Sequence, residues 1–192
     1  MKNLNIKKAA TIIKDPYLTN HISIFHKIIH KFNSFLELRK LEYYFSDFDE
    51  IYFPNQAKQI YDEVYAGVEK KQYPYLVRSL DENVFKFDQS DIFDGENILK
   101  LKNQLHKDTK SWKIVNTRIK SKEFDGANLK IEKLRMRDLS KEKSHLNNYI
   151  AQITLRYKYL PENKTKYIVY ERNLFDNFNF YGWKITCTNY PH

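Results

Sequence analysis

Two histidines one helical turn apart are the first residues whose spacing could support chemistry. His26 and His30 are four positions apart, the spacing at which two imidazoles on one helix face can share a metal ion. A zinc site needs three or four ligands, and neither a cysteine nor a carboxylate stands near this pair in the sequence. We therefore expect no metal and no other cofactor.

Nucleophilic and acid–base catalysis have few candidates. Cys187 is the single cysteine, and its alternation with Trp183 and Ile185 favours a buried, inert thiol. Glu171 is the one carboxylate on the late predicted strands, and its place beside Arg172 favours a structural ion pair or a strand-end residue. General acid–base chemistry would need a carboxylate or histidine base facing an oxyanion donor. We therefore expect no enzymatic activity.

Positive charge gathers in the middle of the chain and points to a phosphate-bearing partner. Residues 98–137 hold twelve basic and four acidic residues, whereas residues 37–97 hold seven basic and fourteen acidic ones. Such a density attracts the phosphates of RNA through counterion release, or anionic lipid headgroups. A solvated face that only keeps the protein soluble is the alternative. The candidate binding residues are Lys113, Arg118, Lys120, Lys122, Lys133, Arg135 and Arg137.

The elements that would position these residues begin with helices. Apolar residues recur at three- and four-residue steps in the first half of the chain, which predicts amphipathic helices. Pro54 suits the first turn of the second helix. An acidic stretch containing Gly95 predicts a loop. The predicted helical segments are 21–47, 53–71, a short one after Pro74, and one around 98–105, with the loop over 88–96 between the last two.

Alternation of apolar and polar residues predicts strands in the second half. In residues 149–159 the aromatic and aliphatic residues alternate with Gln152, Thr154, Arg156 and Lys158. In residues 133–137 Leu134 alternates with cations, which places Lys133, Arg135 and Arg137 on one strand face. Helices followed by a meander predict an α+β fold in which N-terminal helices pack on a curved, antiparallel four-stranded sheet. The predicted strands are 133–137, 149–159, 167–170 and 183–188.

Length and composition fit one folded domain with an N-terminal arm. The chain has 192 residues, of which 42% are hydrophobic, so it can bury a substantial core. We expect residues 1–50 to form a basic arm and long helix, and residues 51–192 to form the α+β domain. The acid-poor, lysine-bearing start is typical of a mitochondrial targeting segment or of an ordinary basic arm. No stretch approaches the roughly 18 consecutive apolar residues of a membrane-spanning helix.

Several segments resemble one known family. A helical pair occurs in the import-motor membrane-anchor family and in the mitochondrial large-ribosomal-subunit protein forty-five family. Three segments of this chain resemble that pair in their order: Gln56-Ala57 to Gly67, Lys70 to Tyr73, and Leu76 to Val84. Residues 149–157, 166–172 and 181–185 resemble the last three strands of the ribosomal protein. The resemblance covers roughly residues 52 to 190. Two departures are a short hairpin over 161–165 and a short N-terminal extension.

The resemblance implies a cone-shaped fold of the nuclear-transport-factor-two-like kind and a location in the mitochondrial matrix at the inner membrane. The expected function is a non-enzymatic mitochondrial structural subunit: a large-ribosomal-subunit protein near the tunnel exit that binds rRNA through the basic block. The expected partners are subunits of a large mitochondrial assembly, rRNA and anionic inner-membrane lipid such as cardiolipin. The alternatives are an accessory subunit of an inner-membrane respiratory or ATP synthase complex, and the import-motor anchor.

Overall fold

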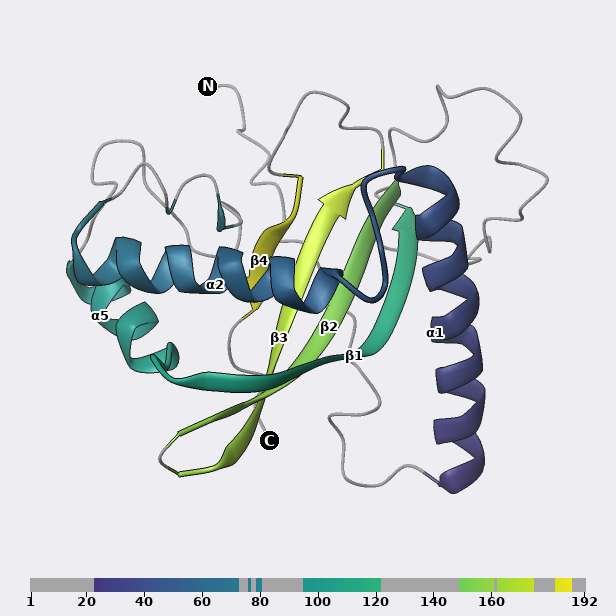
Figure 1. Cartoon of the computed structure of the whole chain (residues 1–192), viewed down its shortest axis with the longest axis horizontal. Helices are drawn as coiled ribbons and strands as arrows, with labels where there is room; N and C mark the ends of the chain where they lie inside the picture. The colour runs from purple at the N-terminus through teal and green to yellow at the C-terminus, as the bar shows by residue number, and fades with distance from the viewer. Residues whose placement is uncertain are drawn as a thin grey trace, which may run out of the picture.

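The computed structural model describes residues 23–72, 76, 79–80, 95–121, 149–160, 162–174 and 182–187. Within these residues, helices pack against a four-stranded antiparallel sheet, so the predicted α+β class is confirmed. The strands follow one another across the sheet in the order β1-β2-β3-β4 (Figure 1). Their bounds are Thr109–Ser121 for β1, Tyr149–Tyr159 for β2, Lys164–Asn173 for β3 and Lys184–Cys187 for β4.

Three helices were predicted close to where they occur. They are α1 over Ile24–Tyr44, α2 over Phe53–Glu69 and α5 over Gly95–Gln104. Pro54 lies in the first turn of α2, where a missing N–H costs no hydrogen bond. The short helix predicted after Pro74 and the loop over 88–96 lie mostly outside the described residues, although Gly95 already belongs to α5.

The first strand of the sheet is a correction to the sequence prediction. The alternation placed that strand at 133–137, which lies outside the described residues, and missed β1. The register of β1 against β2 shifts twice, between Lys110 and Lys113 and again between Ile114 and Asn116. Each shift inserts a residue without a partner and reverses the side-chain alternation. A thirteen-residue strand with two such interruptions shows no clean period of two.

The core lies between the sheet and α2, which crosses the sheet in Figure 1. Tyr61 of α2 packs edge-on against Trp112 of β1, and Trp112 stacks on Tyr157 of β2 with ring centroids 4.6 Å apart. The Tyr170 hydroxyl donates to the Ala57 carbonyl at 2.6 Å. Because Tyr61, Tyr157 and Tyr170 are buried and Trp112 is half-buried, these large side chains supply much of the area that holds α2 on the sheet.

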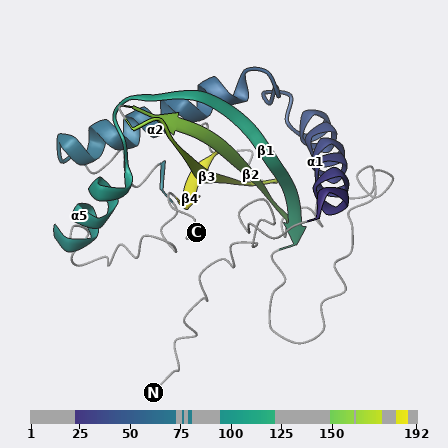
Figure 2. The ribbon, with the colours of Figure 1, turned by 90° about the horizontal axis from the view of Figure 1, so that it is seen from below.

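A second aromatic group joins the segment after α1 to β4. Trp183 packs against Phe45, Phe48 and Phe53, with ring centroids 6.4, 6.0 and 4.8 Å away. The C-terminal half of α1 enters the same core through buried leucines, and α1 contacts β1. Figure 2 shows α1 and α5 at opposite ends of the molecule, with β1 arching between them.

Candidate nucleic-acid interface

The sheet has two faces, and the register of the strands assigns residues to each. Ile153 and Leu155 of β2 and Tyr170 of β3 face the helices and belong to the core. Successive residues of a strand point to opposite faces, so Arg156 and Lys158 lie on the side away from α2, which we call the outer face. Their partners in β1, Lys113 and Lys110, share that face.

Four cations therefore meet on the outer face in two consecutive cross-strand pairs. Lys110 is the Cα partner of Lys158, and Lys113 is the Cα partner of Arg156. Residues directly opposite in an antiparallel pair have Cβ atoms about 4.5–5.5 Å apart, a distance at which like charges destabilise the sheet. We call these four residues the cationic face. None of them forms an ion pair with another described residue.

A backbone irregularity in β1 makes this clustering possible. Ser111 adopts a left-handed conformation with φ of 57° at the first register shift. Residues three apart on a regular strand point to opposite faces, but the extra residue brings Lys110 and Lys113 to the same face. The Trp112 side chain then packs on the core side, against Tyr157.

The outer face is exposed at one end only. Lys110, Lys113 and Arg156 are exposed and Lys158 is half-buried, close to the hairpin that joins β2 and β3. Toward the other end of β2, Gln152 and Thr154 are buried. A partner that needs access to cations would therefore meet the hairpin end of the sheet.

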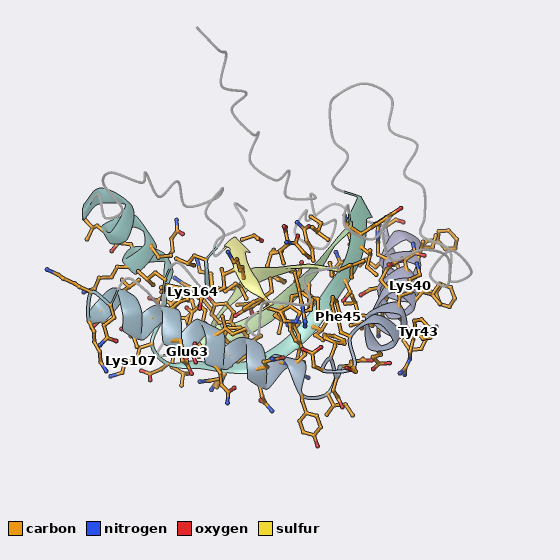
Figure 3. The ribbon with its side chains drawn as sticks, turned by 90° about the horizontal axis from the view of Figure 1, so that it is seen from above. Lys40, Tyr43, Phe45, Glu63, Lys107 and Lys164 are labelled. Carbon is orange, nitrogen blue, oxygen red and sulfur yellow. The ribbon has the colours of Figure 1, made fainter. Side chains whose placement is uncertain are left out.

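Further exposed cations lie toward the hairpin end of the sheet, and the hairpin carboxylate is already engaged. Lys107 and Lys164 are exposed and lie at the same end of the molecule, remote from Lys40 and Tyr43 on α1 (Figure 3). Glu162 pairs with Lys164, and that hydrogen bond, followed by one donated by the Tyr159 hydroxyl, lowers the pKa of the Glu162 carboxyl. Glu162 therefore does not neutralise the four cations.

The predicted binding residues are only partly brought together in the described residues. Lys113 belongs to the cationic face, and Arg118 is half-buried on the outer face opposite Gln152. Lys120 is the Cα partner of Ile150 on that face, but its side chain is not described. The remaining four predicted residues, Lys122, Lys133, Arg135 and Arg137, lie outside the described residues.

Sequence reasoning missed Arg156 and Lys158 and did not select Lys110. The polar alternation of 149–159 already placed Arg156 and Lys158 on one face. Their closeness to Lys110 and Lys113 depends on strand register, because almost forty residues of chain separate β2 from these lysines.

The other residues considered for chemistry have structural surroundings. Glu171 accepts a hydrogen bond from the Gln152 amide at 2.7 Å, whereas the ion pair of Arg172 is with Asp47, at 3.0 Å. The side chains of His26 and Cys187 are not described, so the expectations about them remain predictions. Among the described residues, no group of three or more metal-binding side chains gathers.

Two comparisons with known proteins found no match. Within the described part of the chain, no helix is long and apolar enough to span a membrane. No protein-family model matches the chain, and no curated protein is similar to it.

Proposed function

We propose that the protein is a non-enzymatic RNA-binding subunit of a large mitochondrial assembly, the large ribosomal subunit, and that it holds RNA through the cationic face. The observation that carries the RNA-binding part is the pair of like-charged cross-strand contacts, Lys110–Lys158 and Lys113–Arg156. A fold that gains only solubility from its charges has no need to set cations directly opposite each other. A bound phosphate backbone would turn this repulsion into attraction.

The mitochondrial ribosome is proposed from the sequence. The strand motifs in 149–157, 166–172 and 181–185 resemble those of the ribosomal protein family, and the chain carries a net charge of +9. RNA is favoured over an anionic membrane because the exposed cations lie on a strand face without a neighbouring exposed apolar patch. Among the described large apolar residues that are exposed, only Leu160 belongs to the hairpin region. Interfacial membrane binding normally combines cations with apolar side chains that enter the headgroup layer.

A salt titration with two matched variants tests the binding. For single-stranded RNA the slope of log affinity against log salt is about −0.7 per neutralised phosphate, so removing two cations should reduce the slope by about 1.4. Lys113→Gln with Arg156→Gln removes one cross-strand pair. Lys70→Gln with Lys71→Gln removes two exposed charges at the end of α2, away from the sheet face, and should leave the slope unchanged.

The result that would overturn RNA binding is an unchanged slope in the sheet variant, which would leave the four cations as a solvated face. Vesicles with and without cardiolipin, run in parallel, separate lipid from RNA. Fractionation of native mitochondria tests the assembly. A ribosomal protein travels with rRNA and leaves it at high salt, whereas sedimentation with detergent-solubilised membrane complexes would point to the accessory-subunit alternative.

A further inference from the structure

Helix α1 is apolar on two opposite sides. Its C-terminal half buries Leu38 and Leu41 in the core. At 3.6 residues per turn, a second apolar side lies opposite this one. The second side is 40% to 78% exposed, and Figure 1 shows the N-terminal half of α1 reaching beyond the sheet. Its members are Ile24, Phe25, Ile28, Ile29, Phe32, Phe35 and Leu36. A contiguous exposed apolar surface of this size is typical of an interaction site.

The exposed side has the spacing of a coiled-coil seam. Phe25, Ile28, Phe32 and Phe35 follow one another at steps of three, four and three residues, which is the a-and-d pattern of a heptad. We call these four residues the seam. Ile24, Ile29 and Leu36 flank the seam and widen its apolar edge.

The seam is symmetric about residue 30. When two such helices run antiparallel and cross there, Phe25 of each lies level with Phe35 of the other, and Ile28 with Phe32. Every a position then meets a d position. Within each copy the Arg39 guanidinium lies over the Phe35 ring, 5.1 Å from its centroid, so a cation borders this end of the seam. A two-fold interface requires a self-complementary patch, because each copy presents the same residues. The seam meets this requirement when the two helices are antiparallel.

The exposed area is the size that such an interface needs. Seven apolar side chains exposed by 40% to 78% offer on the order of 800 Å² per copy, which equals the share of one partner in a standard interface. The exposed side of α1 lies opposite the buried Leu38 and Leu41, so among the described residues the sheet does not cover it.

We propose that two copies of this chain form a two-fold dimer through antiparallel packing of their α1 helices along the seam. The interface is separate from the cationic face, because Tyr43 and Lys40 of α1 and the cations Lys107 and Lys164 lie at opposite ends of the molecule in Figure 3. Lys31 flanks the seam close to the two-fold axis, so the two copies of this lysine approach each other. The dimer should therefore strengthen as salt rises, whereas RNA binding weakens.

Sedimentation of the full chain tests the dimer. We expect the wild type to dimerise at micromolar concentration and Phe32→Glu to raise the dissociation constant at least about 100-fold, since it buries a charge from each copy. Leu99→Glu, a matched charge at an exposed apolar residue of α5, should leave the constant unchanged. RNA affinity should be the same in both variants, which separates this proposal from the proposed function.

Two further measurements fix the arrangement. In a chain with Cys187→Ser, Lys31→Cys should form a disulfide-linked dimer, whereas Lys27→Cys, on the side away from the seam, should not. Lys31→Glu should form mixed dimers with wild type in preference to dimers of itself, because one lysine then meets one glutamate. A wild-type protein that stays monomeric would overturn the proposal. A protein whose exposed side of α1 is covered only when anionic vesicles or another protein are added would also overturn it.

Discussion

Lys113 of β1 and Arg156 of β2 are Cα partners, so two cations face each other across an antiparallel ladder. The next pair on the same face, Lys110 and Lys158, repeats the arrangement. Opposite charges at such positions contribute about 0.2–1 kcal/mol to stability relative to an alanine pair, and like charges oppose folding. At these four residues the positive charges therefore lower the stability of the fold while they favour the proposed binding of phosphate.

Reversing one charge should separate the two effects. Lys113→Glu would face Arg156 with a carboxylate, and we expect the free energy of unfolding to rise by about 0.5 kcal/mol while RNA affinity falls. Urea denaturation and a binding titration on the same sample measure the two quantities. The exposed Lys70→Glu at the end of α2 is the control and should change neither by a comparable amount. A variant that loses stability would show that the cross-strand repulsion is not felt.

The contrast between β1 and the other elements shows what a sequence pattern can predict here. The stripe of α2 is uninterrupted and Pro54 marks its start, so local spacing alone predicts the helix. In β2 the sequence alternates without a break, and the residues from Ile150 to Tyr159 pair with β3 without a register shift. In β1 two extra residues reverse the alternation within a few positions, and the period is lost although the strand is long.

The candidate site was also predictable only where its residues give a local signal in the sequence. Charge density singled out Lys113 and Arg118, and both lie on the outer face. Local alternation places Arg156 and Lys158 on one face, but their closeness to the lysines of β1 follows from the pairing of strands, which is a property of the tertiary fold. The register shift at Ser111, which brings Lys110 to the same face, is equally invisible to a search for period two.

The Arg172 side chain packs between the Phe45 ring and Gly182. Its guanidinium carbon lies 4.0 Å from the centre of the Phe45 ring, and it pairs with Asp47. A Cβ at position 182 would lie 2.3 Å from the Arg172 Nε, so Gly182→Ala should displace the side chain and cost about 1–2 kcal/mol of unfolding free energy.

A double-mutant cycle checks the cause of that loss. In an Arg172→Ala background, Gly182→Ala should have almost no effect, because the atom that it meets has gone. Chemical denaturation of the four proteins gives the coupling energy. Additive losses would show that position 182 is strained for another reason.

Alkali should unfold the protein through its buried tyrosines. Burial raises the pKa of the hydroxyls of Tyr61, Tyr157 and Tyr170 above the usual value of about 10. The folded state therefore keeps these protons when the unfolded state begins to lose them. Stability is fully present below about pH 10 and falls as pH rises further. Urea midpoints between pH 8 and 12 measure the fall, and Tyr157→Phe should make it shallower. A flat profile to pH 12 would contradict the prediction.

Trp183 should be one of the most costly residues to truncate. Its ring is buried against three phenylalanines, the nearest with a centroid distance of 4.8 Å to Phe53. Trp183→Ala leaves a cavity among them, and we expect a loss of about 3–5 kcal/mol in the free energy of unfolding. Thermal melting of the isolated variant tests this, with Leu99→Ala on exposed surface as the control. An unchanged melting temperature would refute the role assigned to this ring.

The last prediction concerns Ser111. Its left-handed backbone lies at the register shift that determines which face of the sheet Lys110 occupies relative to Lys113. A non-glycine residue at φ of 57° carries a steric cost of about 1–2 kcal/mol, part of which glycine avoids. Because glycine also loses more entropy on folding, Ser111→Gly should raise the free energy of unfolding by only about 0.5 kcal/mol. Ser111→Val should lower it by about 1–2 kcal/mol, since a β-branched side chain is least compatible with this conformation.

Binding measurements on the same variants connect the backbone to the site. Ser111→Gly keeps the register shift, so Lys110 and Lys113 stay on one face and the salt slope of RNA binding should not change. Deleting Ser111 removes the extra residue and leaves Lys110 and Lys113 two positions apart on a regular strand, which again places both on one face, so the slope should also stay unchanged. Asn163→Gly is the matched control. Asn163 has a φ of 52° in the β2–β3 turn, and asparagine tolerates that region, so little change is expected. If the deletion lowers the slope by about 0.7, the share of one phosphate contact, Lys110 reaches phosphate only from the left-handed backbone at Ser111, and the shared strand face is not sufficient.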